Sequence, residues 1–302
     1  MVYFKHHFLG QKTPVTIRVG WHSRDRSPHM EKMVQRYGVV VSDRGLSNSS
    51  GGGIELDWPF LVEMTVDLPP DWETYCGGMT SSAKRDLRQF RNSELRFVMG
   101  DRRNNLAEFF HHHYGPSMIS MHGDAAIVHS LKKIEGFFDE GGEYVEVWRG
   151  TEWLGGYIGC FKNDLLHFNV LGWKEGAFEL RRTGVVSAMY LDALKRAIER
   201  GIKFFLMGGV PPYLENGLLV YKSKWSGRLD FARSKFPTFR AEIDPRCPAV
   251  RNFFRKNSLI VKDFEKENLD VISDRNPADV SRRREVDKSI GSWRSLDSLS
   301  VR

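Results

Sequence analysis

Residues 165–207 read LLHFNVLGWKEGAFELRRTGVVSAMYLDALKRAIERGIKFFLM and decide the fold. Apolar residues fill Leu165–Leu171 and Ile202–Met207, and runs of this kind are typical of strands, the second of the fully buried type. Between them, apolar residues recur at every fourth position across Thr183–Arg200, the spacing of one helix face, and Gly201 ends the run. A strand, a helix and a second strand in this order predict a βαβ unit.

The flanking segments extend this unit into a mixed α/β sheet with helices on both faces. Two more strands precede it, at Tyr144–Trp148 and Trp153–Phe161, and hairpin-like turns join all three. The other predicted elements are helices at Ser81–Arg91, Asn105–Tyr114, Ala125–Phe138, Leu214–Trp225 and Ala249–Lys256, and strands at Leu95–Val98 and Leu229–Ser234. Gly115 and Pro116 are expected to end the second helix, because proline lacks the N–H that a helix interior uses. We therefore expect a sheet of about six strands over residues 71–234.

Three regions follow from this order: an N-terminal extension over 1–70, a core domain over 71–240 and a C-terminal region over 241–302. The extension is expected to pack on the core through partial strands. These short strands are predicted at Thr16–Val19, Val39–Val41 and Glu63–Asp67. The C-terminal region is predicted to hold one helix and a charged tail that is disordered in part beyond Asn268.

Length and composition fit an ordered globular protein. The chain has 302 residues, of which 41% are hydrophobic and 12% aromatic, enough for a sizeable core. No run of about 18 apolar residues occurs, so no segment is expected to span a membrane. Cys76, Cys160 and Cys247 show no metal-binding or redox spacing and are predicted to be free thiols, which favours a reducing compartment, the cytoplasm.

The net charge of +7 is concentrated in two segments. Residues 81–103 carry seven Lys or Arg, and residues 222–256 carry ten against three acidic residues. Such clusters favour an anionic partner, whether nucleotide phosphates, RNA or an anionic substrate. A solvated basic face without a partner is the alternative that charge alone leaves open.

Arg181, Arg182, Thr183 and Gly184 form a candidate anion site at the start of the long helix. A helix N-terminus leaves N–H groups free and carries the positive end of the helix dipole. The planar forks of two arginines suit phosphate. An ordinary threonine N-cap with surface arginines would have the same local sequence, so both interpretations stay open.

The same residues resemble the coenzyme A loop of GNAT acyltransferases, whose pattern is Arg/Gln-x-x-Gly-x-Gly/Ala. The sequence RRTGVV at 181–186 matches the first arginine and the central glycine. It departs from the pattern at Val186, where the family has a small residue.

Two further segments are similar to the FemAB-like branch of this superfamily. The first is an entry region, DW at 71–72 followed by SSAKRDLR at 81–88. The second is YKSKWSG at 221–227, where the branch has Phe-Lys-x-x-Trp/Phe-Gly; Tyr221 replaces the phenylalanine and Ser226 is inserted before the glycine. The likeness covers residues 71–230.

The resemblance implies a GNAT fold and transfer of an acyl group from a coenzyme A thioester, such as acetyl-coenzyme A, to an amine on a small molecule, a sugar or a peptide. The FemAB-like branch implies an alternative donor, an aminoacyl ester on tRNA. A non-catalytic GNAT-like binding protein is a third interpretation, which Val186 keeps open. In GNAT enzymes two central parallel strands splay to hold the pantetheine arm; by position these are Leu165–Leu171 and Ile202–Met207, which places Val170 and Leu171 at the cofactor.

Three residues after the second of these strands are the candidate catalytic residues. The resemblance singles out Lys222, whose ammonium would hold a phosphate or the reacting carbonyl. Lys222→Met is then expected to cut turnover about a hundredfold with little change in melting temperature. Tyr213 would protonate a leaving thiolate, and Glu215, or Glu175 in the earlier loop, would act as base. A packing tyrosine, surface carboxylates and a helix lysine with a buried stem are the alternatives.

His111, His112 and His113 raise the question of a metal site. Adjacent helix residues point about 100° apart, so three in a row cannot converge on one ion, and we expect no metal. One or two of these imidazoles could still face the site, because residues 112–124 (HHYGPSMISMHGD) are predicted to line a substrate pocket. The sequence has no Gly-x-Ser-x-Gly, no Walker A motif and no Gly-x-Gly-x-x-Gly after a strand, which argues against a serine nucleophile, ATP and NAD.

Overall fold

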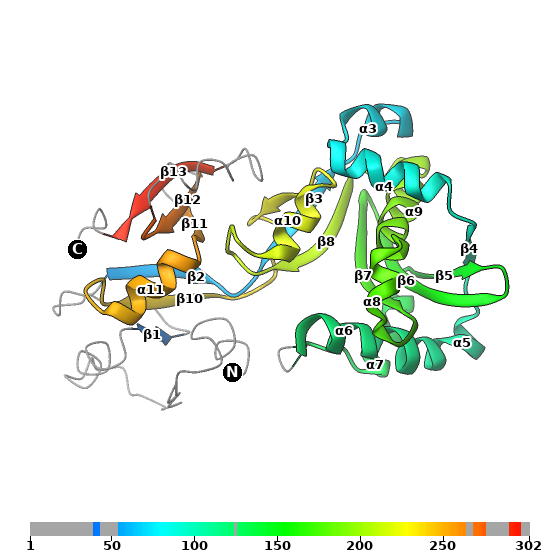
Figure 1. Ribbon diagram of the computed structural model, residues 1–302, viewed down its shortest axis with the longest axis horizontal. Helices are drawn as coiled ribbons and strands as arrows, with labels where there is room; N and C mark the ends of the chain where they lie inside the picture. The colour runs from blue at the N-terminus through cyan, green and yellow to red at the C-terminus, as the bar shows by residue number, and fades with distance from the viewer. Residues whose placement is uncertain (1–38, 43–53, 124–125, 264–267, 276–289, 297–302) are drawn as a thin grey trace.

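The computed structural model describes residues 39–42, 54–123, 126–263, 268–275 and 290–296 (Figure 1). They form one seven-stranded mixed sheet with helices and, beside it, two three-stranded sheets. In Figure 1 the large sheet and its helices occupy the centre and right, and the two small sheets lie on the left. The fold class predicted from the sequence, mixed α/β, is confirmed.

The seven-stranded sheet has the order β4-β5-β6-β7-β8-β3-β9. Its strands are β3 (Val62–Asp67), β4 (Leu95–Met99), β5 (Gly142–Arg149), β6 (Glu152–Lys162), β7 (Leu165–Trp173), β8 (Phe204–Val210) and β9 (Arg228–Asp230). Each pairing in this sheet is antiparallel except that of β7 with β8. The strand predicted at Glu63–Asp67 belongs to this sheet, because β3 pairs with β8 on one edge and with β9 on the other.

Helices pack on both faces of this sheet (Figure 1). The helices on one face are α3 (Trp72–Gly78), α4 (Ser81–Arg91) and α9 (Val185–Glu199). Those on the other are α5 (Arg102–Glu108), the π-helix η1 (Phe109–Tyr114), α6 (Gly115–His122) and α7 (Leu131–Asp139). Phe168 faces the α9 layer and Val170 faces the α7 layer, although residues two positions apart in a strand normally share a face. A bulge explains this change of face: Ile158 pairs with Val170 and Gly159 with Phe168, so Asn169 is an extra residue in β7.

The pairing of β7 with β8 is short. It holds at Leu165↔Phe204, Leu166↔Phe205 and His167↔Leu206, and then ends although both strands continue. Figure 1 shows the two ribbons side by side at their amino ends and apart at their carboxyl ends. This parallel pair and its splay are the arrangement that the sequence resemblance implies. The helix predicted over Thr183–Arg200 is the one continuous helix α9.

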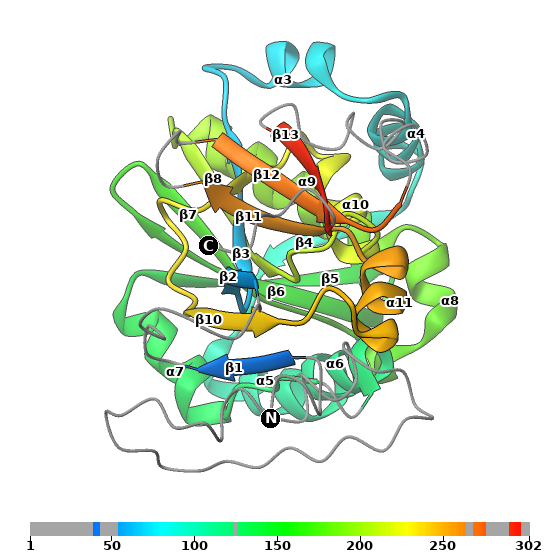
Figure 2. The same cartoon turned by 90° about the vertical axis from the view of Figure 1, so that its left-hand side faces the viewer.

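The two small sheets and one helix form a second module. Its elements are β1 (Val39–Ser42), β2 (Ile54–Pro59), β10 (Thr238–Ile243), α11 (Pro248–Lys256), β11 (Leu259–Asp263), β12 (Asn268–Ser273) and β13 (Ile290–Ser295). Figure 2 shows them in front of the large sheet. The pairing of β2 with β10 joins the two ends of the chain around Trp58, Phe253 and Phe254, which are buried together. The strands β12 and β13 lie in the region beyond Asn268, for which a tail disordered in part is expected from the sequence.

The helix after Asn105 differs most from the prediction. Gly115 and Pro116 do not end it, because α5, η1 and α6 follow one another without a break. The N–H of Gly115 donates to the carbonyl of Phe110, five residues back, and this wide π turn accommodates the ring of the proline that follows. The next helix begins at Leu131 with Ser130 as its N-cap, and not at Ala125. Thr16–Val19 lies outside the described residues.

Candidate active site

The open edge of β7 is the first component of the site. The N–H of Trp173 donates to Ser117 Oγ at 2.9 Å, and that hydroxyl donates to the Trp173 carbonyl at 3.0 Å. The peptide groups of Trp173 therefore point away from β6 and are covered by α6. Since peptide direction alternates along a strand, the N–H and C=O of Leu171 point to the same edge, beyond the last residue pair with β8. Of the two predicted cofactor residues on β7, Leu171 offers its backbone there, whereas Val170 is a core side chain.

The carboxyl end of β8 is the second component, and Lys222 fixes its shape. Lys222 lies on α10 (Gly217–Ser223) and is buried. Its Nζ donates to the carbonyls of Met207, Gly208 and Gly209 at 2.5, 2.8 and 3.3 Å. An ammonium has three N–H donors, and all three are used here. Gly208 has a φ of +79°, so the chain needs glycine at the centre of this bulge.

Glu63 balances the charge of Lys222 from the other strand. It is buried on β3 opposite Gly209, and one of its oxygens, Oε1, has no hydrogen-bond partner in the structure. Burial raises the pKa of Glu63, and the nearby Lys222 ammonium opposes that rise. Burial lowers the pKa of Lys222 to about 8, and the Glu63 carboxylate opposes that fall, so the ammonium is the form present at neutral pH.

The start of α9 is the third component. Gly184 is its N-cap, with a φ of 86°, and Gln89 of α4 lies over it and donates to the carbonyl of Thr183 at 2.9 Å. Arg181 and Arg182 are exposed at the end of the short helix α8 (Phe178–Arg182), as is Thr183. The four residues of the predicted anion site therefore lie together beside the first turn of α9.

A carboxylate lies beside the first turn of this helix. Ser187, in the first turn of α9, donates to Asp86 of α4 at 2.6 Å, and Lys224 donates to the same oxygen at 2.6 Å. A negative group is stabilised at this end of a helix. Val186, where the family pattern has a small residue, is buried in the core. The exposed side of the turn, around Arg181 and Gly184, is the part left for a ligand phosphate.

Unpaired guanidinium groups extend from this turn along α4. Arg85, Arg88 and Arg91 are exposed and make no ion pair with a described residue, and the same holds for Arg181 and Arg182. The contact of Gln89 with Thr183 places the two sets side by side. The basic segment 81–91 therefore forms one surface with the start of α9, whereas most basic residues of 222–256 are in ion pairs or in the second module.

Tyr213 is part of the second module and not of the splay. It is buried against Trp58 and Phe253, and its backbone forms a β-bridge with Leu259. Burial raises its pKa above the usual range. A buried phenol with these neighbours is a packing residue.

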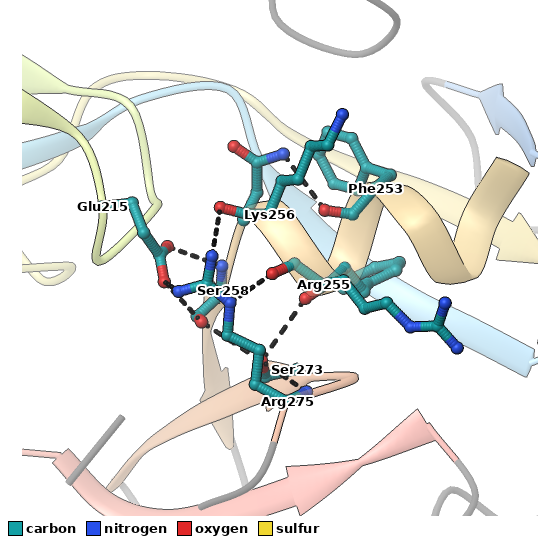
Figure 3. A network of polar contacts seen from close by, with 9 residues as sticks. Glu215, Phe253, Arg255, Lys256, Ser258, Ser273 and Arg275 are labelled. Atoms are coloured by element: carbon teal, nitrogen blue, oxygen red, sulfur yellow. Dashed lines mark hydrogen bonds and ion pairs between the residues drawn. The ribbon is translucent and has the colours of Figure 1, made fainter. Parts of the chain in front are cut away.

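Glu215 lies in the polar network of Figure 3, which joins the loop before α10 to the second module. Its carboxylate accepts the N–H and Oγ of Ser258 at 2.7 and 2.8 Å and the guanidinium of Arg275 at 3.1 Å. Arg275 also donates to the carbonyl of Arg255 at the end of α11. Both oxygens of Glu215 are engaged. Glu215 and Tyr213 therefore contact the second module, whereas Lys222 bonds to β8 and Leu171 lies on β7.

Sequence reasoning missed Glu63, Asp86 and Ser187. Glu63 had been assigned to a short strand of the extension, and nothing local indicates that β3 lies beside β8. Asp86 is one of eight residues in the SSAKRDLR segment, and its partners are more than a hundred positions away. No cluster of His, Cys, Asp and Glu that could hold a metal ion occurs among the described residues.

No helix in the described part of the chain combines the length and apolarity needed to cross a membrane.

No family model and no curated protein matches the sequence. Among solved structures, a crystal structure of FemX is similar over 72% of this chain and 69% of its own, with 13% identity and a TM-score of 0.46. L-PGS from Bacillus licheniformis shows 12% identity and a TM-score of 0.40, and a GCN5-related N-acetyltransferase from Sphaerobacter thermophilus shows 8% and 0.37. The matches cover 65% and 72% of this chain and 64% and 56% of those two proteins, less than two thirds of each. With identities and scores this low, the chemistry of this chain has to be argued from its own residues.

Proposed function

We propose that this protein transfers an acyl group from a coenzyme A thioester to an amine. The observation that carries the proposal is the open edge of β7, where the peptide groups of Leu171 lack a strand partner because β8 has diverged. An extended donor with amide groups can bind there as a short additional strand. Its carbonyl would then lie between the diverging strands, at the carboxyl ends where ligands of α/β sheets collect.

The site would act chiefly by positioning. The amine attacks the thioester carbonyl, the C–N bond forms, and the C–S bond breaks with its electron pair leaving on sulfur. A backbone N–H aimed at the developing oxyanion stabilises this step. Lys222 takes part indirectly, because its bonds to Met207, Gly208 and Gly209 hold β8 away from β7.

The donor phosphates are assigned to the exposed side of the α9 start. Arg181, Arg182, Thr183 and Gly184 would bind them, with the backbone of Leu171 at the far end of the donor arm and the core side chain of Val170 supporting that strand. The acceptor is an amine of a small molecule, a sugar or a peptide. The cytoplasm stays the expected compartment from cysteine usage.

A second donor, an aminoacyl ester on tRNA, is favoured by a different observation. Arg85, Arg88 and Arg91 continue the basic surface of Arg181 along α4, a helix about 16 Å long at 1.5 Å per residue. A run of unpaired guanidiniums of this length suits a nucleic-acid backbone better than one cofactor. The Asp86 carboxylate at the α9 N-terminus also leaves less room for a pyrophosphate there.

A donor panel tests the proposal and separates the two donors. Acetyl-coenzyme A, a longer acyl-coenzyme A and bulk aminoacyl-tRNA are each added in a thermal-shift assay, where a ligand at 100 times its dissociation constant stabilises by about 2.7 kcal/mol. We expect coenzyme A thioesters to stabilise the protein and Arg181→Glu to weaken their binding about tenfold or more, the loss of one charge-assisted bond. Arg103→Glu, the same charge change on α5, is the control and should leave donor binding unchanged.

Each outcome of the panel has one interpretation. Stabilisation by aminoacyl-tRNA alone, lost in Arg88→Glu, assigns the second donor. No stabilisation by any donor and no transfer contradict an acyltransferase function and favour a binding protein.

A further inference from the structure

The π-helix η1 lies unusually close to the end of β7. A Cβ on Gly172 would be 2.5 Å from Cα and N of Tyr114, so only glycine permits this approach. The approach is fixed further by Ser117 of α6, whose hydroxyl bonds both polar groups of the Trp173 backbone. π turns are rare and occur often at functional sites. Here the turn carries three adjacent histidines, of which His112 faces the turn after β7.

The turn after β7 is also unusual. Glu175 has a φ of 53°, and Asn163, Glu175 and Ser226 are the only non-glycine residues with positive φ among those described. This conformation is strained for a residue with a side chain. Gly176 follows with a φ of 62°, and a Cβ on it would be 2.5 Å from the carbonyl oxygen of Pro116. The turn is therefore shaped to fit η1 and α6.

These two features bring one histidine to one carboxylate. Nδ1 of His112 lies 3.3 Å from Oε1 of Glu175, and both side chains are more than half exposed, at 60% and 63%. A carboxylate only accepts hydrogen bonds, so the shared proton is on Nδ1 and Nε2 keeps its lone pair. This is the arrangement of a base held by an orienting carboxylate.

The pair also lies beside the proposed donor site. Glu175 is two residues after Trp173, and Leu171 is about 7 Å up the strand from Trp173 at 3.3 Å per residue. In Figure 1 α6 lies below the carboxyl end of β7, on the side from which β8 has diverged. An amine that enters from solvent at this end would pass His112 before it reaches a carbonyl at Leu171.

We infer that Nε2 of His112 is the base that takes the proton from the acceptor amine, and that Glu175 is the positioning residue that holds it. The inference rests on the proposed function. As the nitrogen attacks, its proton moves to Nε2, the C–N bond forms and the bond to the leaving group breaks. The imidazolium then returns the proton, directly or through water, to the leaving thiolate or alkoxide.

The other candidates for this role are less suitable. His113 is buried between the rings of Phe109 and Trp153, where burial lowers its pKa, and both of its nitrogens are enclosed. Both oxygens of Glu215 are engaged in the second module. The carboxylate of Glu175 from the turn faces His112, and His113 of its own helical segment interacts with it electrostatically.

The test measures transfer rates as a function of pH in His112→Gln and Glu175→Gln. Loss of the base should lower kcat about a hundredfold and remove the acidic limb of the pH profile, which reports protonation of the imidazole. Glu175→Gln should lower kcat and leave KM unchanged, because the imidazole loses the carboxylate that orients it. Neither variant should change the melting temperature, since both side chains are exposed. Glu152→Gln removes the neighbouring exposed ion pair with Lys174, 2.8 Å long, and should keep full activity.

The outcomes separate this inference from the proposed function. Transfer by the wild type together with a His112→Gln rate within threefold of it overturns the role of His112 and leaves the acyltransferase function intact. A kcat in Glu175→Gln within threefold of the wild type overturns the role of Glu175. A wild type that transfers to no amine from any donor contradicts the proposed function itself, and the inference with it.

Discussion

Replacing Lys222 by methionine is expected to lower the free energy of unfolding by about 3–5 kcal/mol, because each buried acceptor left without its donor costs about 1–3 kcal/mol. The lysine is almost fully buried, and its loss leaves the carbonyls of Met207, Gly208 and Gly209 without their donor and Glu63 without its counter-charge. Urea denaturation followed by circular dichroism measures the change. The side chain that the family resemblance assigns to the reaction is in this structure the anchor of β8.

A matched control is available at Lys203, the residue directly before β8. Lys203→Met removes an exposed lysine that pairs with Asp164 at 2.8 Å, and its unfolding curve should barely change. If Lys222→Met instead keeps wild-type stability and loses about a hundredfold in turnover, the lysine acts on the substrate. The assignment of Lys222 as an anchor would then be wrong, and the expectation from sequence would hold.

Gly172→Ala is expected to disrupt the contact of η1 with β7. The added Cβ would be 2.5 Å from backbone atoms of Tyr114, which cannot rotate away as a side chain can. Overpacking of this kind costs about 1–3 kcal/mol and shifts the backbone. Because the shift moves His112 away from Glu175, transfer should fall by at least tenfold in protein that is still folded.

Gly136→Ala is the control for this substitution. Gly136 lies within α7 with nothing within 4 Å of a Cβ, and alanine is the better helix former. It should therefore be neutral or slightly stabilising, with full activity. A Gly172→Ala variant that is as stable and as active as Gly136→Ala would show that the close approach of η1 has no functional role.

The local elements of the fold could be predicted because their signals are local. The apolar spacing across Thr183–Arg200 gave α9, and the runs before and after it gave β7 and β8. The continuation of the helix through Gly115 could not be predicted, because proline is a strong signal for the end of a helix and a π turn has no sequence signal of similar strength. The second module was not predicted for another reason: β2 and β10 pair across 179 to 189 residues of sequence.

In the candidate site too, residues with a local sequence signal could be predicted, and their distant partners could not. Arg181, Gly184 and Leu171 were found from a motif and a strand end, and the structure places them at the start of α9 and on the open edge of β7. Lys222 was found, but its partners were not, because three consecutive carbonyls become acceptors only once β8 bulges at Gly208. No local sequence signal gives Glu215 a partner, but in the structure its carboxylate accepts a hydrogen bond from the N–H of Ser258, which lies 43 residues later.

Hydrogen–deuterium exchange with and without the bound donor tests the central claim most directly, that the open edge of β7 receives the acyl donor. Within the described part of the chain, the amide of Leu171 has no strand partner on that edge, whereas the amide of Trp173 donates to Ser117. We predict that the donor slows exchange in peptides covering 168–173 and 181–187 and leaves those covering β5, at 142–149, unchanged. Donor binding that leaves 168–173 unchanged and protects only the second module would contradict the account.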